Sequence, residues 1–340
     1  MTLETFREIS APEAIALAPR VSVYVAAYRH EKYLEAAVDS IMAQQTDFPI
    51  EVVIGEDRSP DGTLAIALEL QRKYPQNVRV IAGDENVGGL RNSTRCLALC
   101  RGDFIAFCEG DDFWHDPHKL QIQIDVMMAD ANIMLCHTDY DRLIGRRLKR
   151  SMHTRNPSPY LADGDAYLSL LHEWTVMTVT SVYRASIIRN FLETAFLRFD
   201  WPFGDYPKSL YASVQGSVAY VPRSTGTWRK VRGSLSNAGF SATLRLRLAA
   251  IECKDVFMEA FPVPEDVQSS VRDRANRTIM HDAFYADDLT TYLQAKARCS
   301  PSARRYLRDW LSEAGIRARL PVLMARVFRK AVLRMTSHAL

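Results

Sequence analysis

The sequence has 340 residues and a formal net charge of +3 at pH 7, from 43 basic and 40 acidic residues. Beyond Glu313 the charged residues are all basic, so the preceding sequence is weakly acidic overall, which excludes a general nucleic-acid-binding surface. The sequence has no apolar run long enough to span a bilayer, its start is acidic (Glu4, Glu8, Glu13), and its six cysteines are scattered. These features predict a cytoplasmic protein with reduced thiols.

The first 140 residues alternate between β-rich runs and amphipathic helical patterns. The β-rich runs predict strands at 21–27, 50–56, 78–82, 104–108 and 133–137. The intervening patterns predict helices at 33–44, from the cap at 61–63 to Tyr74, at 90–100 and from Pro117 onward. Repeated βα units of this size predict a mostly parallel sheet with helices on both faces, and ligands of such sheets bind beyond the carboxyl ends of the strands.

The second half of the chain has a different pattern. Residues 141–156 are basic and turn-prone, which predicts a loop or a mobile lid. Further β-rich runs lie at 176–183, 217–221 and 226–229, and the sequence beyond residue 241 is almost wholly helical. We therefore expect an α/β part at 1–240 and a helical C-terminal region at 241–340.

Three carboxylates, Glu109, Asp111 and Asp112, directly follow the predicted strand at 104–108. Carboxylates this close repel one another unless a cation holds them together. Mg²⁺ or Mn²⁺ held by one or two carboxylates keeps positions open for substrate phosphates, and such an ion can stabilise a departing diphosphate. The alternative is a solvated turn, but the preceding apolar strand and the aromatic pair Phe113–Trp114 favour a metal site.

Two other segments place polar groups at strand ends. Asp57 follows the strand at 50–56, where its carboxylate could accept hydrogen bonds from a nucleobase or ribose. Residues 61–63 are typical of a turn and a helix cap. Residues 86–92 form a glycine turn into a helix, with Arg91 in the first helical turn. A cation is unfavourable there, so a bound anion would compensate.

In order and spacing, these segments resemble family 2 glycosyltransferases, which have the GT-A fold. The resemblance is strong over the first 140 residues and extends more weakly to about Ser236. It implies an α/β, GT-A-type mixed, mostly parallel sheet with a nucleotide-sugar-binding half at 20–140 and an acceptor half at 141–240. The matching segments are 21–23, Tyr28, 56–63, 86–88, 91–92, 109–114 and 116–120.

The resemblance also implies roles for single residues. Asp111 would be the main ligand of the Mg²⁺ or Mn²⁺ cofactor. Glu109 stands where the family often has aspartate, which keeps the charge but lengthens the reach. The donor would most often be a UDP-sugar, with Ala27, Tyr28 and Asp57 around its base. Arg91 would lie near the nucleotide or its phosphates, and Glu109 at the ribose or behind the metal ligands. Asp112 would lie near the sugar.

The segment at 203–207 resembles the family's catalytic-base segment. A sugar hydroxyl is a poor nucleophile until its proton is removed, and the carboxylate of Asp205 could remove it. Asp205 also precedes a helical run that starts near Pro207, so a helix N-cap is the alternative role, and the two roles are compatible. Thr180 and Ser181 could line the sugar pocket, although alternating strand packing explains their segment nearly as well.

Residues 228–234 correspond to a region where relatives often have a Tyr-Arg-x-His segment. Val231 stands in place of that histidine, which can assist metal or diphosphate binding. Arg229, Lys230 or Arg232 could neutralise the leaving diphosphate instead. The Gln-x-x-Arg-Trp segment expected of processive polysaccharide synthases is absent, which favours an enzyme that adds one sugar.

Together these features predict an inverting glycosyltransferase acting on a glycan or a lipid-linked glycan. Two alternatives stay open, namely a catalytically silent nucleotide- or glycan-binding scaffold and a nucleotidyltransferase. The C-terminal segment from Leu320 to Met335 has an apolar face and a basic face. Such a helix packs on its own protein, joins subunits of a homo-oligomer, or contacts an anionic membrane peripherally at its inner face.

Overall fold

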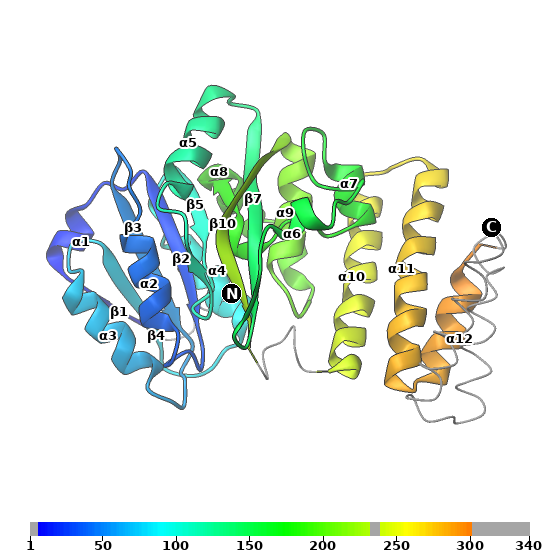
Figure 1. Ribbon diagram of the computed structural model, residues 1–340, viewed down its shortest axis with the longest axis horizontal. Coiled ribbons are helices and arrows are strands. Elements are labelled where there is room, and N and C mark those ends of the chain that lie inside the picture. Colours follow the sequence, from blue (N-terminus) through cyan, green and yellow to red (C-terminus); the bar gives the residue numbers. More distant parts are fainter. Residues whose placement is uncertain (1–5, 232–238, 301–340) are drawn as a thin grey trace. The chain divides into compact units, whose positions relative to one another are not determined.

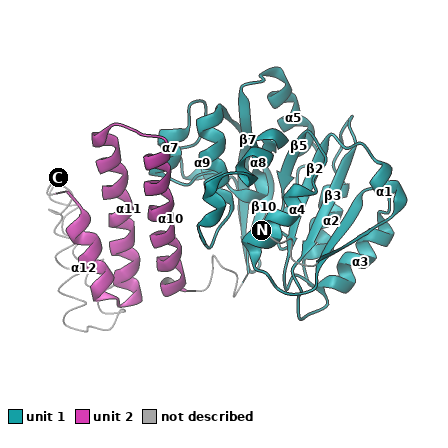
Figure 2. Ribbon diagram, turned by 180° about the vertical axis from the view of Figure 1, so that it is seen from behind, with its two compact units in different colours: residues 1–231 teal, residues 232–340 magenta. Residues whose placement is uncertain are grey.

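The computed structural model describes residues 6–231 and 239–300. Two compact units divide the chain, residues 1–231 and residues 232–340 (Figure 2). Helix α10 (Phe240–Ala260) begins at the boundary expected near residue 240, whereas the two units divide between residues 231 and 232. The assignment of 1–240 to catalysis and 241–340 to a helical region stays a prediction, and the basic segment from Leu320 to Met335 lies outside the described residues.

Unit 1 is built on a ten-stranded mixed sheet with the order β1-β4-β3-β2-β5-β9-β7-β10-β6, with β8 paired to β7. Figure 1 labels β1 to β5, β7 and β10 of this sheet. Strand β2 (Val21–Ala27) pairs in parallel with β3 (Ile50–Glu56) and β5 (Phe104–Phe107), and β3 pairs in parallel with β4 (Val78–Gly83). The carboxyl ends of these four strands therefore meet at one edge of the sheet. Antiparallel pairings bring in β1 (Phe6–Ser10), β6 (Phe113–Trp114) and β9 (Val182–Arg184).

Helices flank this sheet, as the βα alternation predicts. Helix α2 packs against α3, α4 against α8, and α8 against α9. Their bounds, with the shorter elements of unit 1, are α1 (Pro12–Ala16), α2 (Leu34–Met42), α3 (Thr63–Lys73), α4 (Gly89–Ala98), α5 (Lys119–Ala129), α6 (Met152–Arg155), α7 (Tyr167–His172), α8 (Ala185–Leu192) and α9 (Asp205–Gln215), with 3₁₀ turns at Thr178–Thr180 and Ala195–Arg198.

Burial explains why the central strands read as nearly continuous apolar runs. Every residue of β3 is buried, as are six of the seven residues of β2. A strand covered on both faces needs apolar side chains at successive positions instead of in alternation. The strands at 21–27 and 50–56 are confirmed at both ends, because this pattern is bounded by polar turns.

The prediction for the second half of unit 1 is wrong in two places. The expected loop at 141–156 instead contains the end of β7 (Ile133–Ile144), β8 (Arg147–Lys149) and α6. The expected strand at 176–183 is a 3₁₀ turn followed by the short β9. The runs at 217–221 and 226–229 are parts of one strand, β10 (Ser217–Lys230), which pairs in parallel with β7 through three register shifts.

A buried ion network fixes the amino-terminal side of the sheet. The carboxylate of Glu51, on β3, is fully buried and accepts hydrogen bonds from Ser22 Oγ at 2.6 Å and Arg101 Nη2 at 2.6 Å. Arg79, on β4, donates to Glu51 at 3.0 Å and to Glu8 of β1 at 2.8 Å. Burial alone would raise the pKa of Glu51, but these hydrogen bonds and charges outweigh it and lower the pKa.

Unit 2 contains three described helices, α10, α11 (Glu265–Ala286) and α12 (Leu289–Arg298). Its core joins all three helices and includes Leu244, Ile279, Phe284 and Tyr292. Within the described ranges, no helix is both long enough and apolar enough to cross a bilayer.

Candidate active site

The predicted base-binding residues lie at the ends of β2 and β3. Ala27 is buried and Tyr28 is 38% exposed, and the Asp57 backbone N–H donates to the Ala27 carbonyl at 3.1 Å. The Asp57 carboxylate is buried and accepts from the backbone N–H groups of Val87 at 3.0 Å and Gly88 at 2.9 Å. Asp57 thus holds the turn that precedes α4, and its predicted contact with the base stays a prediction.

Gly88 allows this turn because its φ of +83° lies in the left-handed region that other residues rarely adopt. Helix α4 begins at the next residue, so Arg91 lies in its first turn, where it is exposed. Arg95 lies one turn further along and is buried, with Nη2 3.6 Å from Asp57 Oδ1. The sequence analysis missed Arg95, although its position four residues after Arg91 places both on one helix face.

The acidic loop after β5, residues 109–112, is a tight turn against β2. Gly110 N–H donates to the Ala26 carbonyl at 2.9 Å, and Asp112 N–H donates to the Glu109 carbonyl at 2.9 Å. A Cβ at position 110 would lie 2.7 Å from His30 Nδ1 and 2.9 Å from the Ala26 carbonyl oxygen, so only glycine fits without a shift. This close approach carries the three carboxylates to the edge where β2 and β3 end.

The electrostatics of the acidic loop oppose ionisation of all its carboxylates together. Burial, with the negative charges of Asp205 and Asp111, raises the pKa of Glu109 to about 8. Burial, followed by the charges of Glu109 and Asp111, raises the pKa of Asp112 well above its ordinary value. Such crowding is relieved by a cation, and carboxylate oxygens are the ligands that Mg²⁺ and Mn²⁺ prefer.

Asp205 is the first residue of α9, and Gly204 is the N-cap. The alternative in which Asp205 itself caps the helix is therefore wrong by one position, because the helix begins two residues before Pro207. The Asp205 carboxylate accepts a hydrogen bond from Thr178 Oγ1 at 2.7 Å. Burial raises the pKa of Asp205, and the Thr178 hydrogen bond and the charge of Lys208 oppose that rise.

Thr180 and Ser181, expected near the sugar, are almost fully buried. Thr180 Oγ1 donates to the Met177 carbonyl at 2.8 Å, and Ser181 Oγ donates to the Thr178 carbonyl at 2.9 Å. Both hydroxyls therefore stabilise the 3₁₀ turn. The residue of this turn that reaches the carboxylates is Thr178.

Strand β10 brings Arg229 to the acidic loop. The Arg229 backbone N–H donates to Asp112 Oδ1 at 2.7 Å, and the guanidinium lies over the rings of Tyr33 at 4.7 Å and Phe113 at 5.2 Å. Val231 N–H donates to the Arg229 carbonyl. Arg232, the other arginine proposed for the diphosphate, lies outside the described residues.

A family model described as glycosyl transferase family 2 matches residues 22–192, which is half of the chain. The chain belongs to glycosyl transferase family 2. The matched segment includes the acidic loop and Thr178 and ends before Asp205.

Relatives of this family 2 chain match it over part of its length. An uncharacterized protein of Mycobacterium tuberculosis is 38% identical over 210 residues, which cover 62% of this chain and 58% of that protein. The chain thus aligns with less than two thirds of this relative's length.

Two solved structures share the fold of this family 2 chain. The mannosyltransferase PcManGT from Pyrobaculum calidifontis in complex with GDP-Man and Mn²⁺ has a TM-score of 0.56 at 15% identity, covering 94% of this chain and 89% of that chain. S. aureus TarS 1-349 in complex with UDP-GlcNAc has a TM-score of 0.51 at 17% identity, covering 88% of this chain and 92% of that chain. The predicted GT-A-type fold, a mixed sheet flanked by helices, is confirmed.

The structure of this family 2 chain adds Lys208 to the site. Lys208 lies one turn into α9, is 4% exposed, and donates from Nζ to the Gly204 carbonyl at 2.5 Å. Burial lowers the pKa of Lys208 to about 8, and the charges of Asp205 and Glu109 oppose that shift. The spacing of three residues from Asp205 was the available signal, but sequence alone does not tell which way the ammonium points.

His30 is a second residue that the sequence analysis missed. Its Nε2 lies 3.9 Å from Asp111 Oδ1, with the two side chains 19% and 14% exposed. Burial lowers the pKa of His30, and the charge of Asp111 opposes the shift. The polar cluster at 28–30 after β2 was the signal, since it follows a strand of the parallel sheet.

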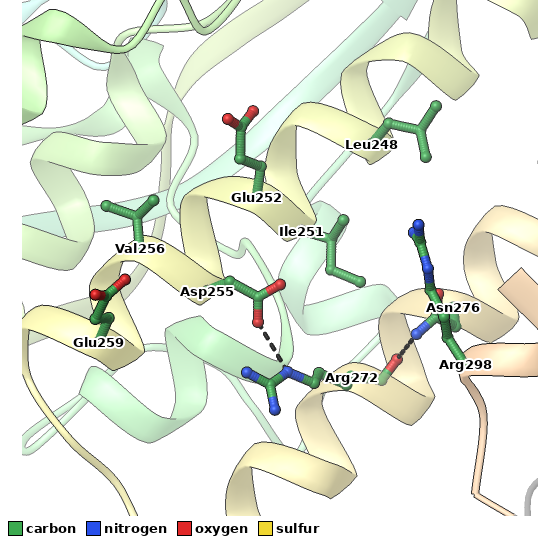
Figure 3. A pocket seen from close by; sticks show the side chains of 9 residues that line it. All are labelled: Leu248, Ile251, Glu252, Asp255, Val256, Glu259, Arg272, Asn276 and Arg298. Carbon is green, nitrogen blue, oxygen red and sulfur yellow. Dashed lines mark hydrogen bonds and ion pairs between the residues drawn. The ribbon is translucent and has the colours of Figure 1, made fainter. Parts of the chain in front are cut away.

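A separate cavity of about 610 Å³ lies in unit 2 (Figure 3). It is lined by one face of α10 together with residues of α11 and the last residue of α12. Asp255 pairs with Arg272 at 2.8 Å across it. It contains none of the carboxylates of the acidic loop.

Proposed function

We propose that this chain is an inverting glycosyltransferase that moves one sugar from a nucleotide diphosphate sugar, with a UDP-sugar favoured, to a hydroxyl of a glycan or lipid-linked glycan. The observation that carries the proposal is the position of the first turn of α9 beside the end of β5, where Lys208 Nζ lies 5.9 Å from the centre of the Phe107 ring, just before the acidic loop. The negative charge of Asp205 reaches Glu109 and helps to raise its pKa. The proposed base and the acidic loop thus lie near each other at the edge where parallel sheets bind ligands.

The proposed step is an in-line displacement at the anomeric carbon. Asp205 takes the proton of the acceptor hydroxyl as the acceptor oxygen forms its bond to that carbon. The bond from the carbon to the diphosphate oxygen breaks, and the nucleoside diphosphate leaves with the electron pair. The raised pKa of Asp205 suits this role, because a more basic carboxylate accepts a proton more readily.

The other residues would bind and orient the donor. Ala27, Tyr28 and Asp57 would surround the base, and Arg91 would contact the phosphates. Mg²⁺ or Mn²⁺ held by Asp111 would supply positive charge for the leaving diphosphate. Glu109 would contact the ribose or support the metal ligands, and Asp112 would lie near the sugar, held by the Arg229 backbone.

A donor panel tests the proposal. It should contain UDP- and GDP-sugars, since the two solved structures named above contain one of each, with Mg²⁺ or Mn²⁺ and glycan or lipid-linked acceptors. We expect transfer from one donor, with the opposite anomeric configuration in the product by NMR. Asp205→Asn should reduce kcat by about 10²–10⁴-fold and leave nucleotide binding within twofold.

Asp200→Asn is a matched control, because Asp200 is exposed and lies on the same segment. It should leave kcat unchanged. Nucleotide binding without hydrolysis or transfer across the whole panel would instead support the scaffold alternative. Retention of the anomeric configuration would contradict the single displacement.

A further inference from the structure

The gap between His30 and Asp111 has the dimensions of a shared metal site. The two facing atoms, Nε2 and Oδ1, are 3.9 Å apart, which is too long for a hydrogen bond. Two ligand atoms at about 2.1 Å from one divalent ion lie roughly 3 to 4 Å apart. We propose that His30 is the second protein ligand of the divalent cation in this family 2 site, beside Asp111. This inference rests on the proposed function, because that function is what requires a divalent cation at the site.

The backbone around His30 is fixed independently of any ligand. Its N–H donates to Thr63 Oγ1 at 2.8 Å, and its carbonyl accepts from Tyr33 and Leu34 N–H at 2.9 Å each. The preceding residue, Arg29, has a φ of +60°, a conformation that costs energy in a residue other than glycine. The chain therefore turns sharply after β2 and delivers the imidazole to the acidic loop.

The other ring nitrogen also fits a ligating histidine. Nδ1 is buried and forms no hydrogen bond of normal geometry within the described part of the chain. It lies against Gly110, and the Ala26 carbonyl is the backbone acceptor that faces the ring. Metal-bound imidazoles characteristically direct the second nitrogen to a carbonyl or carboxylate, which orients the ring. The glycine at 110 leaves the space that this arrangement needs.

Two protein ligands suit this kind of cation. No cluster of three or more His, Cys, Asp or Glu side chains arranged to hold a metal is found among residues 6–231 and 239–300. A cation that also binds substrate phosphates needs only one or two protein ligands.

An imidazole ligand also predicts which cation is preferred. Mg²⁺ is a hard cation that favours oxygen ligands and keeps several waters, so an imidazole nitrogen in place of an oxygen ligand disfavours Mg²⁺ more than the softer Mn²⁺. We therefore expect the 340-residue chain to bind Mn²⁺ at least about tenfold more tightly than Mg²⁺. His30→Gln should remove most of this preference, because the remaining protein ligand is a carboxylate.

Electron paramagnetic resonance tests the inference without an activity assay. Free Mn²⁺ is titrated against the full chain in the presence of UDP, and in parallel GDP. His30→Gln should weaken Mn²⁺ binding about tenfold or more. His115→Gln is the matched control, since His115 lies just past the acidic loop but its ring contacts Thr227 at 2.9 Å and the Ser224 carbonyl at 3.0 Å. It should leave Mn²⁺ binding within twofold.

Electron spin echo modulation of Mn²⁺ bound to the unaltered chain provides a readout that needs no variant. A ¹⁴N coupling typical of a bound imidazole is expected in the wild type and in His115→Gln, and it should be lost in His30→Gln. Absence of the coupling in the wild type, or unchanged Mn²⁺ affinity in a folded His30→Gln, overturns the inference. If Mn²⁺ is bound by a nitrogen ligand but no sugar is transferred, the role of His30 as a ligand is supported and the proposed function is contradicted.

Discussion

Thr178 Oγ1 donates a 2.7 Å hydrogen bond to the carboxylate of Asp205, across 27 positions of sequence. The hydrogen bond favours the ionised carboxylate, against burial, which favours the protonated form. Thr178 therefore helps to keep the proposed base ready to accept a proton at neutral pH.

Thr178→Val should raise the pKa of Asp205 further. A base with a higher pKa stays protonated, and therefore inactive, up to a higher pH. The acid limb of the pH profile of kcat/KM should move to higher pH, with kcat reduced at pH 6 and recovering at pH 8. Thr178→Ser keeps the hydroxyl and should keep the wild-type profile. An unshifted acid limb in the valine variant would show that Thr178 does not act on the base.

Lys208→Met should impair catalysis beyond any effect on folding. The substitution removes a buried positive charge that favours the ionised forms of Asp205 and Glu109, so the acid limb should again move to higher pH. The pH profile of kcat/KM, recorded for the wild type and for the methionine variant, measures this shift.

Lys119→Met is the matched control for that experiment. Lys119 is also fully buried, but its ammonium donates to Gln123 Oε1 at 2.7 Å and lies over the Trp114 ring at 4.3 Å. Lys119→Met leaves the Gln123 amide oxygen without its hydrogen-bond donor, which lowers the free energy of unfolding by about 1–3 kcal/mol. A lowered Tm with an unchanged pH profile is expected. If both variants shift the profile equally, the specific role of Lys208 is wrong.

Asp57→Asn should weaken donor binding with little change in kcat. The amide presents an N–H₂ group to one of the backbone donors of Val87 and Gly88, so the turn before α4 and Arg91 loses one hydrogen bond. A rise of roughly tenfold in donor KM corresponds to about 1.4 kcal/mol. Asp84→Asn, at an exposed position on the same segment, should leave KM unchanged. Equal KM values in the two variants would remove Asp57 from the donor site.

Glu51→Gln should destabilise unit 1 by about 1–3 kcal/mol, because Arg79 and Arg101 lose the buried carboxylate that they share, while Arg79 keeps its ion pair with Glu8. The lowered pKa of Glu51 means that its contribution is present above the unfolded value, near 4.5, and is lost as the pH falls through the folded value. Urea titrations between pH 3 and 7 should therefore show a steeper acid loss in the wild type than in the variant. The exposed Glu35→Gln should change stability by less than about 0.5 kcal/mol.

The first half of the fold could be predicted from local patterns, whereas the second half could not. Strands β2 and β3 are bounded by turn residues and buried on both faces, so apolar runs mark them. Strand β7 extends through Asp139, Asp141 and Arg142, charged residues that are typical of a loop. Its partner β10 is distant in sequence and pairs through register shifts, and no local pattern contains such a pairing.

The candidate site divides in the same way. The order of motifs predicts that the acidic loop and Asp205 are parts of one site, and this stays a prediction. The individual contacts depend on how antiparallel β9 and the 3₁₀ turn before it bring Thr178 to α9, and on how the sharp turn at Arg29 directs His30. These contacts follow from packing between segments that are far apart in the sequence and from the backbone φ angle of Arg29. Residue types alone indicate neither.

The contact between β10 and the acidic loop has a consequence for sequence variation. Asp112 is held by the main-chain N–H of position 229, not by the arginine side chain. Any amino acid except proline supplies that donor, so the loop can keep its geometry while evolution or an engineer changes the side chain at 229. Arg229→Ala therefore removes only the side-chain charge proposed for the diphosphate, whereas Arg229→Pro removes both that charge and the backbone donor that anchors the Asp112 carboxylate.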